Sequence, residues 1–180
     1  MSHTDFIPAG WSPGAAHLAG RVLLITGAAD GIGRALARGS AAHGATVILL
    51  DRNVRGLESL YDEIVADKSP EPAIYPMDLK GATPADYAAL AETLQQEFGQ
   101  LDGLVHNAAM LGALTPLSHY DDELWFEILQ TGLNAPYLLT RNCLDLITRA
   151  QDASVLFMAD SVGRHGKAYW GAYGVAKAGI

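Results

Sequence analysis

Cysteine is almost missing from this sequence, which holds one, Cys143, among 180 residues. A single cysteine excludes an internal disulfide. Because Cys143 lies in an apolar helical pattern, we interpret it as a buried small hydrophobe rather than as a nucleophile. No spacing of histidine, cysteine and aspartate resembles a metal site, so the sequence predicts no metal.

Long apolar runs and an excess of basic residues are also absent. No apolar run approaches the length of a membrane span. Lysine and arginine number 12 against 20 acidic residues, and the net charge of −8 argues against nucleic acid or an anionic membrane as a partner. The N-terminus lacks a basic segment followed by an apolar stretch, so we expect no secretory signal and a cytoplasmic location.

The length and the apolar content are those of a single domain. Apolar residues make up 49% of the 180, which is enough for a sizeable α/β core. Residues 1–20 mix proline and glycine with small and polar residues and show no periodicity, so they predict a flexible N-terminal arm. Residues 21–180 are then the folded domain.

Strand and helix patterns alternate along the domain. Short β-branched and aliphatic runs predict parallel strands, and amphipathic stretches between them predict helices. Such an order specifies an α/β fold with a doubly wound parallel sheet and right-handed crossovers. The predicted strands are 22–25, 45–50, 73–77, 101–106 and 154–158, and the helices are 31–43, 54–66, 83–99, 120–149 and one that begins near Gly171.

Two prolines modify this pattern. Pro76 cannot donate a hydrogen bond to a neighbouring strand, so the strand at 73–77 should lie at the sheet edge. Pro136 lies four residues after Gly132 in the long helix and lacks the N–H that would bond the Gly132 carbonyl. A kink is therefore predicted there, with that carbonyl left free.

The segment from Thr26 to Gly33 is the strongest functional motif. It follows a buried strand and opens a helix, and its glycines fall in the pattern G-x-x-x-G-x-G. Gly27 turns the chain, Gly31 allows close approach of a ligand, and Gly33 lets the helix lie against the strand. Because a helix N-terminus carries unpaired N–H groups and partial positive charge, the predicted ligand is the pyrophosphate of a dinucleotide.

Asp51 ends the second strand about 20 residues after this loop, where an acid accepts hydrogen bonds from a ribose 2′-hydroxyl. Its charge would repel a 2′-phosphate, so we predict NAD rather than NADP. Arg52 and Arg55 keep NADP open, because arginine commonly binds phosphate.

Tyr173 and Lys177 lie four residues apart and therefore on one face of the last helix. An ammonium near a phenol lowers the phenol pKa, as a general acid/base requires. The spacing alone also fits a packed tyrosine beside a lysine that reaches solvent.

Taken in order, the motifs resemble the short-chain dehydrogenase/reductase family, a group of NAD(P)-binding Rossmann folds. The resemblance covers Arg21 to Ile180 and the N-terminal two-thirds of the family. It is carried by the glycine loop, Asp51, Asp78-Leu79, the run His106-Asn107-Ala108-Ala109 and Tyr173-x-x-x-Lys177.

The resemblance implies roles for these residues. Tyr173 would be the catalytic acid/base and Lys177 would hold the nicotinamide ribose, while Asp78 would contact adenine and Asn107 would pass beside the cofactor. The implied cofactor-binding residues are Gly27, Asp30, Gly31, Ile32, Gly33, Asp51, Asp78, Leu79, Asn107, Tyr173 and Lys177.

Three departures from the family pattern stand out. Asp160 occupies the position of the catalytic serine, and Ser161 beside it would need a register shift to replace that serine. An ionised Asp160 would oppose a developing alkoxide and, if close, raise the pKa of Tyr173. It could instead be protonated, or form an ion pair with Lys177 or Arg164, and we expect the ion pair.

The second departure is Gly132, where the family has an asparagine whose backbone carbonyl holds a water of the proton relay. The third is length, because the chain stops one turn after Lys177, and we expect it to be a C-terminally truncated fragment. The fifth strand is then an unprotected sheet edge.

Two functions from different classes follow. The first is an NAD(P)-dependent oxidoreductase that transfers hydride between nicotinamide and a small carbonyl or alcohol substrate. The second is a nucleotide-binding protein impaired in this catalysis, in view of Asp160 and Gly132. A methyltransferase or other binder would leave Tyr173 and Lys177 together unexplained. Family members usually form oligomers through the long helix and the tyrosine helix, so a homo-oligomer is expected at full length.

Overall fold

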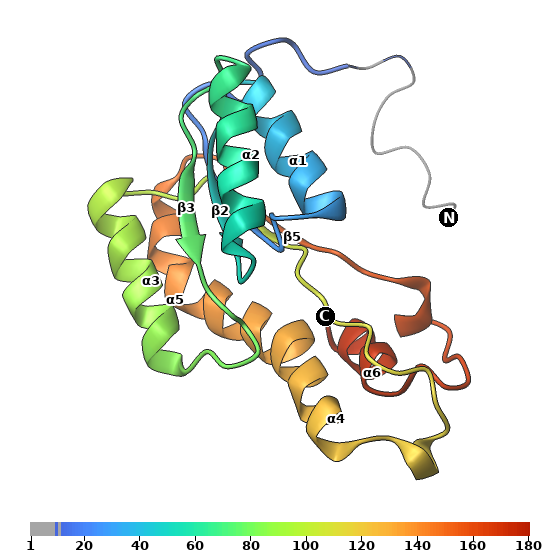
Figure 1. Ribbon diagram of the computed structural model, residues 1–180. Coiled ribbons are helices and arrows are strands. Elements are labelled where there is room, and N and C mark those ends of the chain that lie inside the picture. Colours follow the sequence, from blue (N-terminus) through green and yellow to red (C-terminus); the bar gives the residue numbers. More distant parts are fainter. Residues whose placement is uncertain (1–9, 11) are drawn as a thin grey trace.

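A computed structural model describes residues 10 and 12–180 of the protein. Its sheet has five parallel strands in the order β3-β2-β1-β4-β5 (Figure 1). The strands are β1 Val22–Thr26, β2 Thr46–Asp51, β3 Ala73–Pro76, β4 Gly103–His106 and β5 Ser154–Phe157. The strand order reverses direction between β1 and β4, so the predicted doubly wound α/β sheet is confirmed.

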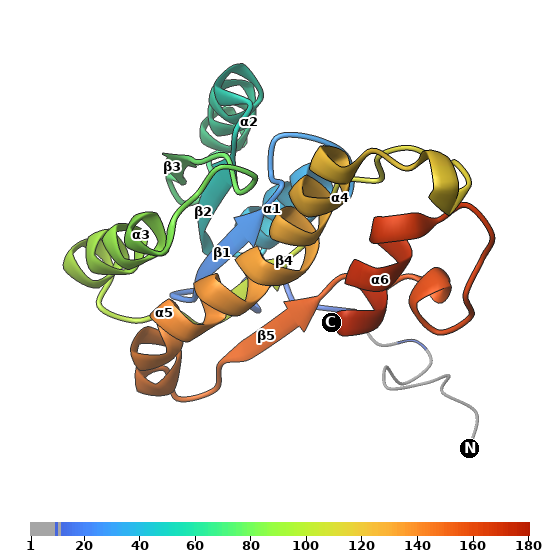
Figure 2. The ribbon, with the colours of Figure 1, turned by 90° about the horizontal axis from the view of Figure 1, so that it is seen from below.

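Four helices cover the two faces of the sheet (Figure 2). They are α1 Gly31–Ala42 and α2 Val54–Ala66 on one face, and α3 Pro84–Glu97 and α5 Ala135–Arg149 on the other. Alternate strand residues divide between the faces, because side chains along a strand point in opposite directions. Ile25 and Leu49 pack under α1 and α2, whereas Leu24 and Leu50 pack under α3 and α5.

Local sequence signals explain several of these boundaries. Thr83 and Asp86 form a capping box at the start of α3, and Pro84 occupies its first turn. Pro76 ends β3, which pairs with β2 alone and lies at the sheet edge, as predicted from its missing N–H.

The long helix predicted at 120–149 is three elements in the structure. α4 runs from Asp122 to Leu129, a π-helical turn follows at Gln130–Asn134, and α5 begins at Ala135. The Ala135 N–H donates to the Gln130 carbonyl, five residues back. The predicted interruption beside Pro136 is therefore present as a widened turn, a feature often found at functional sites.

The final part of the chain lies beyond the carboxyl ends of the strands. Short 3₁₀ turns at Leu117–His119 and Ser161–Gly163 lead into α4 and toward α6, which spans Gly171–Gly179. α6 packs against α4 and the π-helical turn (Figure 1). β5 has one unpaired edge, and Leu156 on it is exposed.

Half of the N-terminal arm predicted at 1–20 lies outside the described residues, which omit 1–9 and 11. Its last part contacts the end of α1: the Leu18 N–H donates to the His43 carbonyl, and Leu18 packs against the core beneath that helix. Among the described helices none combines the length and apolar character needed to cross a membrane.

Candidate functional site

The glycine loop joins β1 to α1 through an unusually close backbone approach. A Cβ at Gly33 would lie 2.1 Å from the Gly27 carbonyl oxygen and 2.5 Å from Nδ2 of Asn107, so only glycine fits there. Gly27 has a φ of +67°, which favours glycine, and its own Cβ would meet Asn107 and Ala108. The sequence prediction that Gly33 brings the helix onto the strand agrees with this geometry.

Thr26 and Asn107 tie the loop to the end of β4. The Thr26 hydroxyl donates to the Val105 carbonyl at 3.2 Å and accepts the N–H groups of Asn107 and Ala108, each at 3.1 Å. The Asn107 amide returns two bonds, to the Thr26 and Gly27 carbonyls at 3.0 and 3.2 Å. Asn107 thus holds the glycine loop from the neighbouring strand.

The start of α1 leaves backbone donors for a ligand. Asp30 caps the helix by accepting the Gly31 N–H at 2.7 Å. The next two N–H groups, of Ile32 and Gly33, have no partner among the described residues. A Cβ at Gly31 would meet nothing within 4 Å, and the Ile32 side chain is 60% exposed, so this end of α1 faces open space.

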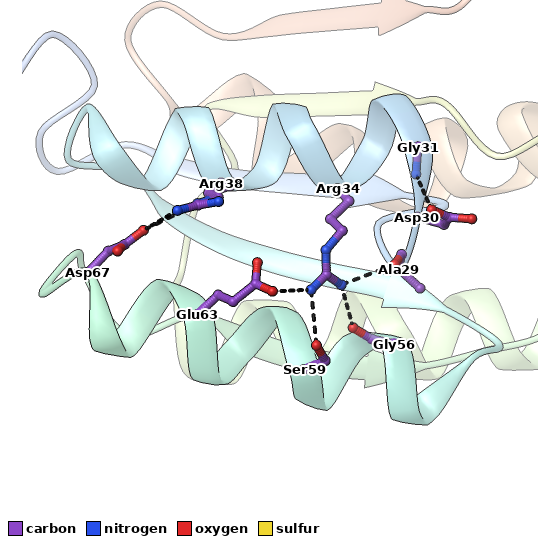
Figure 3. A network of polar contacts seen from close by, with 9 residues as sticks. All are labelled: Ala29, Asp30, Gly31, Arg34, Arg38, Gly56, Ser59, Glu63 and Asp67. Atoms are coloured by element: carbon purple, nitrogen blue, oxygen red, sulfur yellow. Dashed lines mark hydrogen bonds and ion pairs between the residues drawn. The ribbon is translucent and has the colours of Figure 1, made fainter.

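Arg34 connects the loop to α2 (Figure 3). Its guanidinium donates to the carbonyls of Ala29 and Gly56 at 3.2 and 3.0 Å, to the Ser59 hydroxyl at 3.0 Å and to Glu63 at 2.8 Å. The side chain is only 24% exposed, and these four acceptors use most of its donors. Sequence reasoning missed this residue because three of its four partners, on α2, are more than 20 residues away in sequence.

A cleft of about 430 Å³ opens along the carboxyl ends of the strands. Six of the predicted cofactor-binding residues line it: Gly27, Asp30, Asp51, Asp78, Leu79 and Asn107. Arg52, which the sequence analysis named as a possible phosphate partner, also lines it. Met110 and Thr131 line it too and were not predicted. Met110 follows a strand end closely, which is the signal that could have found it, but nothing local marks Thr131.

The acidic residues at this edge differ in their partners. Asp51 accepts the Ala29 N–H on one oxygen at 3.2 Å and the Asn53 N–H on the other at 2.9 Å. Asp78 accepts the Lys80 N–H at 3.1 Å. Each carboxylate is therefore oriented by backbone donors, and Asp51 also joins the glycine loop to β2.

A second group of predicted residues lies on α6 and the turn before it. The Tyr173 hydroxyl donates to Asp160 at 3.0 Å. Asp160 also accepts the Val162 N–H at 3.0 Å and the Ser161 hydroxyl at 3.3 Å. Asp160 is therefore held as a hydrogen-bond acceptor by three donors, one of which is the phenol that the family motif makes catalytic.

These bonds move the pKa values of both partners apart. The Val162 N–H, followed by the Tyr173 hydroxyl, lowers the pKa of Asp160, so this carboxyl is ionised and has no proton to donate. Burial, together with the bond to Asp160, raises the pKa of Tyr173 to about 12. The sequence expectation that a nearby Asp160 raises the pKa of Tyr173 agrees with this arrangement.

The expected ion pair of Asp160 is wrong. Among the described residues no ion pair includes Asp160, and Arg164 and Lys177 are both unpaired. Lys177 donates instead to the Met158 carbonyl, and its ammonium lies 5.6 Å from the centre of the Tyr173 ring. The ion pair fails because the turn at 161–163 directs Asp160 back onto its own backbone. Burial lowers the pKa of Lys177, and the charge of Asp160 opposes that shift.

Gly132 is buried in the π-helical turn and contacts α6. A Cβ at this position would lie 3.0 Å from the Ala176 Cβ, which is tighter than nine in ten real Cβ contacts. The asparagine of the family pattern therefore would not fit here without a shift of α6. The glycine at 132 and the position of the tyrosine helix are linked by packing.

Comparisons with known proteins agree with this geometry. Residues 21–180 match the family model described as short chain dehydrogenase. The uncharacterised oxidoreductase YciK of Escherichia coli K12 is 38% identical over 157 residues, which cover 87% of this chain and 62% of that protein. This chain thus spans less than two-thirds of the length of that relative.

Solved structures show the same fold. A short chain dehydrogenase from Pseudomonas syringae has a TM-score of 0.91 and 46% identity, covering 94% of this chain and 70% of that one. A short chain dehydrogenase from Escherichia coli CFT073, complexed with NADPH, has a TM-score of 0.90 and 38% identity, covering 93% and 70%. The family match, the sheet order and the glycine loop agree: this chain belongs to the short chain dehydrogenase family, with a Rossmann-type fold.

Proposed function

We propose that the protein is an NAD(P)-dependent oxidoreductase that binds its dinucleotide in the cleft at the strand ends. The observation that carries this proposal is the glycine loop, with Gly33 packed on the Gly27 carbonyl and unpartnered N–H groups at the start of α1. Such a helix end accommodates a pyrophosphate. Asp51 and Asp78 would then face the adenosine half, and Asn107 would support the loop beneath it.

For the second half of the site, we assign the proton chemistry to Tyr173. When bound, the nicotinamide supplies or accepts a hydride at the substrate carbon. Tyr173 would give a proton to the developing alkoxide, or take one from an alcohol, and Lys177 would hold the nicotinamide ribose. Ser161 is the remaining hydroxyl beside them, and its bond to Asp160 would have to break before it could polarise a carbonyl.

The choice of dinucleotide rests on two neighbouring residues. Asp51, whose charge favours NAD, has both oxygens engaged by backbone N–H groups. Arg52 lines the cleft, is exposed, and has no carboxylate partner among the described residues. Since a similar solved structure is complexed with NADPH, we propose NADP(H), with Arg52 facing the 2′-phosphate. This replaces the preference for NAD drawn from Asp51 alone.

Calorimetric titration with NADPH and NADH tests the cofactor assignment. We expect tighter binding of NADPH, and Arg52→Gln should weaken NADPH roughly tenfold while leaving NADH nearly unchanged. Arg141→Gln, on an exposed face of α5, is the matched control. Absence of binding by either dinucleotide to folded protein would refute the proposed function.

A second candidate is a dinucleotide-binding protein without this catalysis. The bond from Tyr173 to Asp160 favours it, because the phenol is held in its protonated form by a carboxylate. Turnover of a panel of ketones and alcohols separates the two candidates. Turnover that Tyr173→Phe abolishes supports the oxidoreductase, whereas tight dinucleotide binding without any turnover supports the second candidate.

A further inference from the structure

The charge of the molecule is unevenly distributed along the chain. The net charge is −8, yet the last twenty residues, 161–180, contain Arg164, Lys167 and Lys177 and no acidic residue. Two of these cations and His165 lie on the loop between Asp160 and α6. A basic segment on an acidic protein concentrates anions at one place on the surface.

The loop cations are available to a ligand. Arg164, His165 and Lys167 are exposed, and no ion pair among residues 10 and 12–180 includes any of them. Elsewhere, Arg21, Arg34, Arg38 and Lys80 do have carboxylate partners. The Asp160 carboxylate at the start of this loop is already engaged by its own three donors.

A second hollow, of about 360 Å³, lies between this loop and the outer side of α6. Its walls are mostly small or apolar and include Val162, Gly163, Gly174 and Val175. Lys167 and Trp170 also line it. The hollow therefore combines an apolar wall, which suits a methylene chain, with one ammonium group.

Trp170 connects this hollow to the proposed catalytic tyrosine. The centre of its ring lies 5.7 Å from the ring centre of Tyr173. The Lys167 ammonium lies 4.9 Å from the centre of the same Trp170 ring. The indole ring therefore contacts both the Tyr173 ring and the Lys167 ammonium. A molecule whose reactive carbon lies at Tyr173 could extend along the indole to reach Lys167.

We propose that the hollow beside Trp170 binds the far end of the substrate, and that this end carries an anionic group. The substrate class is then a ketone or secondary alcohol joined by an apolar spacer to a carboxylate or phosphate. Lys167 and Arg164 bind the anion, and Trp170 packs against the spacer. This inference rests on the proposed oxidoreductase function and makes Lys167, Arg164 and Trp170 specificity-determining residues.

Matched probes test the anionic end. We would measure kcat/KM with NADPH, and calorimetric affinity in its presence, for 7-oxooctanoate, its neutral methyl ester and 6-oxoheptylphosphonate. The three share one ketone and a similar spacer. The anionic probes should exceed the ester roughly tenfold in kcat/KM at 20 mM NaCl, and this preference should shrink in 0.5 M NaCl because exposed charges are screened. The two anions distinguish a carboxylate site from a phosphate site.

Variants distinguish a specific site from general attraction. The double variant Arg164→Gln/Lys167→Gln should remove the preference for the anions without changing kcat/KM for the ester. Arg141→Gln removes one cation on α5, away from the hollow, and should change neither the preference for the anionic probes nor kcat/KM for the ester. Equal values for acid and ester in the unmodified protein, or a preference that survives the double variant, would overturn the inference. If the probes are not turned over, calorimetry alone decides the preference. Failure of NADPH itself to bind would refute the proposed function instead.

Discussion

The two halves of the proposed site are supported very differently. The glycine loop is fixed from three sides: by Asn107 directly after β4, by Asp51 on β2 and through Arg34 to α2. The tyrosine group depends on one short helix, α6, which buries only Ala172 and Ala176 among its described residues. Close packing therefore fixes the proposed dinucleotide site, whereas burial and the bond to Asp160 together raise the pKa of the proposed catalytic phenol.

Gly33→Ala should cause the largest effect, because it forces apart the contact on which the glycine loop depends. The added Cβ would lie 2.1 Å from the Gly27 carbonyl oxygen. We expect a loss of about 3 kcal/mol in the free energy of unfolding, typical of severe overpacking, together with loss of dinucleotide binding. Denaturant unfolding and calorimetry measure the two effects.

Gly39→Ala is the matched control on the same helix, since a Cβ there meets nothing within 4 Å. It should stabilise the protein by about 0.5–1 kcal/mol, because alanine is the better helix former. Equal unfolding free energies and equal dinucleotide affinities for Gly33→Ala and Gly39→Ala would show that the loop is not held by this contact.

Asp160→Ser tests the other half of the comparison. It replaces an ionised acceptor by a hydroxyl that can donate to a developing oxyanion, so ketone reduction should become faster by about a hundredfold. The pKa of Tyr173 should fall from about 12, because the carboxylate that favours the protonated phenol is gone. Alcohol oxidation needs the deprotonated phenol, so the pH range in which its rate rises would move to lower pH.

Asp160→Ala separates charge from donor chemistry, because it removes the charge without supplying any hydrogen-bond donor. It should shift the pH profile in the same direction and raise the rate less. Turnover by the unmodified protein as fast as that of Asp160→Ser would mean that Asp160 does not impair the site.

His106 ends β4 and contacts Phe157 on β5 and Thr140 on α5, so its titration tests how firmly these elements pack together. Its ring stacks on Phe157 with centres 4.7 Å apart, and Nε2 lies 2.8 Å from the Thr140 hydroxyl. Burial lowers its pKa from 6.5 to about 4. The unfolded chain therefore binds a proton first as pH falls, so stability present above pH 6.5 is lost between 6.5 and 4.

This loss should amount to about 2 kcal/mol at pH 5. His106→Gln removes the titrating group, so the difference in unfolding free energy between variant and unmodified protein should change with pH by that amount. A constant difference from pH 7 to pH 5 would contradict the assignment.

Arg34 and Arg38 lie on one face of α1 and give the comparison with the smallest expected effect on stability (Figure 3). Arg34 is 24% exposed and bonds four groups, whereas Arg38 is 56% exposed and bonds Asp67 alone. Arg34→Met should cost about 2 kcal/mol, because it leaves partly buried carbonyls without donors. Arg38→Met should cost less than about 0.5 kcal/mol, as is usual for exposed pairs. Thermal unfolding compares them, and equal costs would show that the Arg34 network contributes little.

Several features of the fold and site were predictable because their causes are local. The edge position of β3 follows from the missing N–H of Pro76, and the start of α3 follows from Thr83, Pro84 and Asp86. The widened turn before α5 follows from Pro136, although its π-helical form does not. Boundaries of the other elements agree within a few residues, because buried strands and amphipathic helices have distinct periods.

What the sequence by itself determined is the α/β order, the glycine loop and the set of polar residues at the strand ends, since each depends on short-range patterns. Only the tertiary structure decided the partners: Asp160 bonds Tyr173 rather than a cation, Arg34 reaches α2, and the Trp170 ring contacts both Tyr173 and the Lys167 ammonium. The physical reason is that hydrogen bonds and ring contacts between separate elements depend on distances of a few ångströms, which backbone packing sets and no local pattern records.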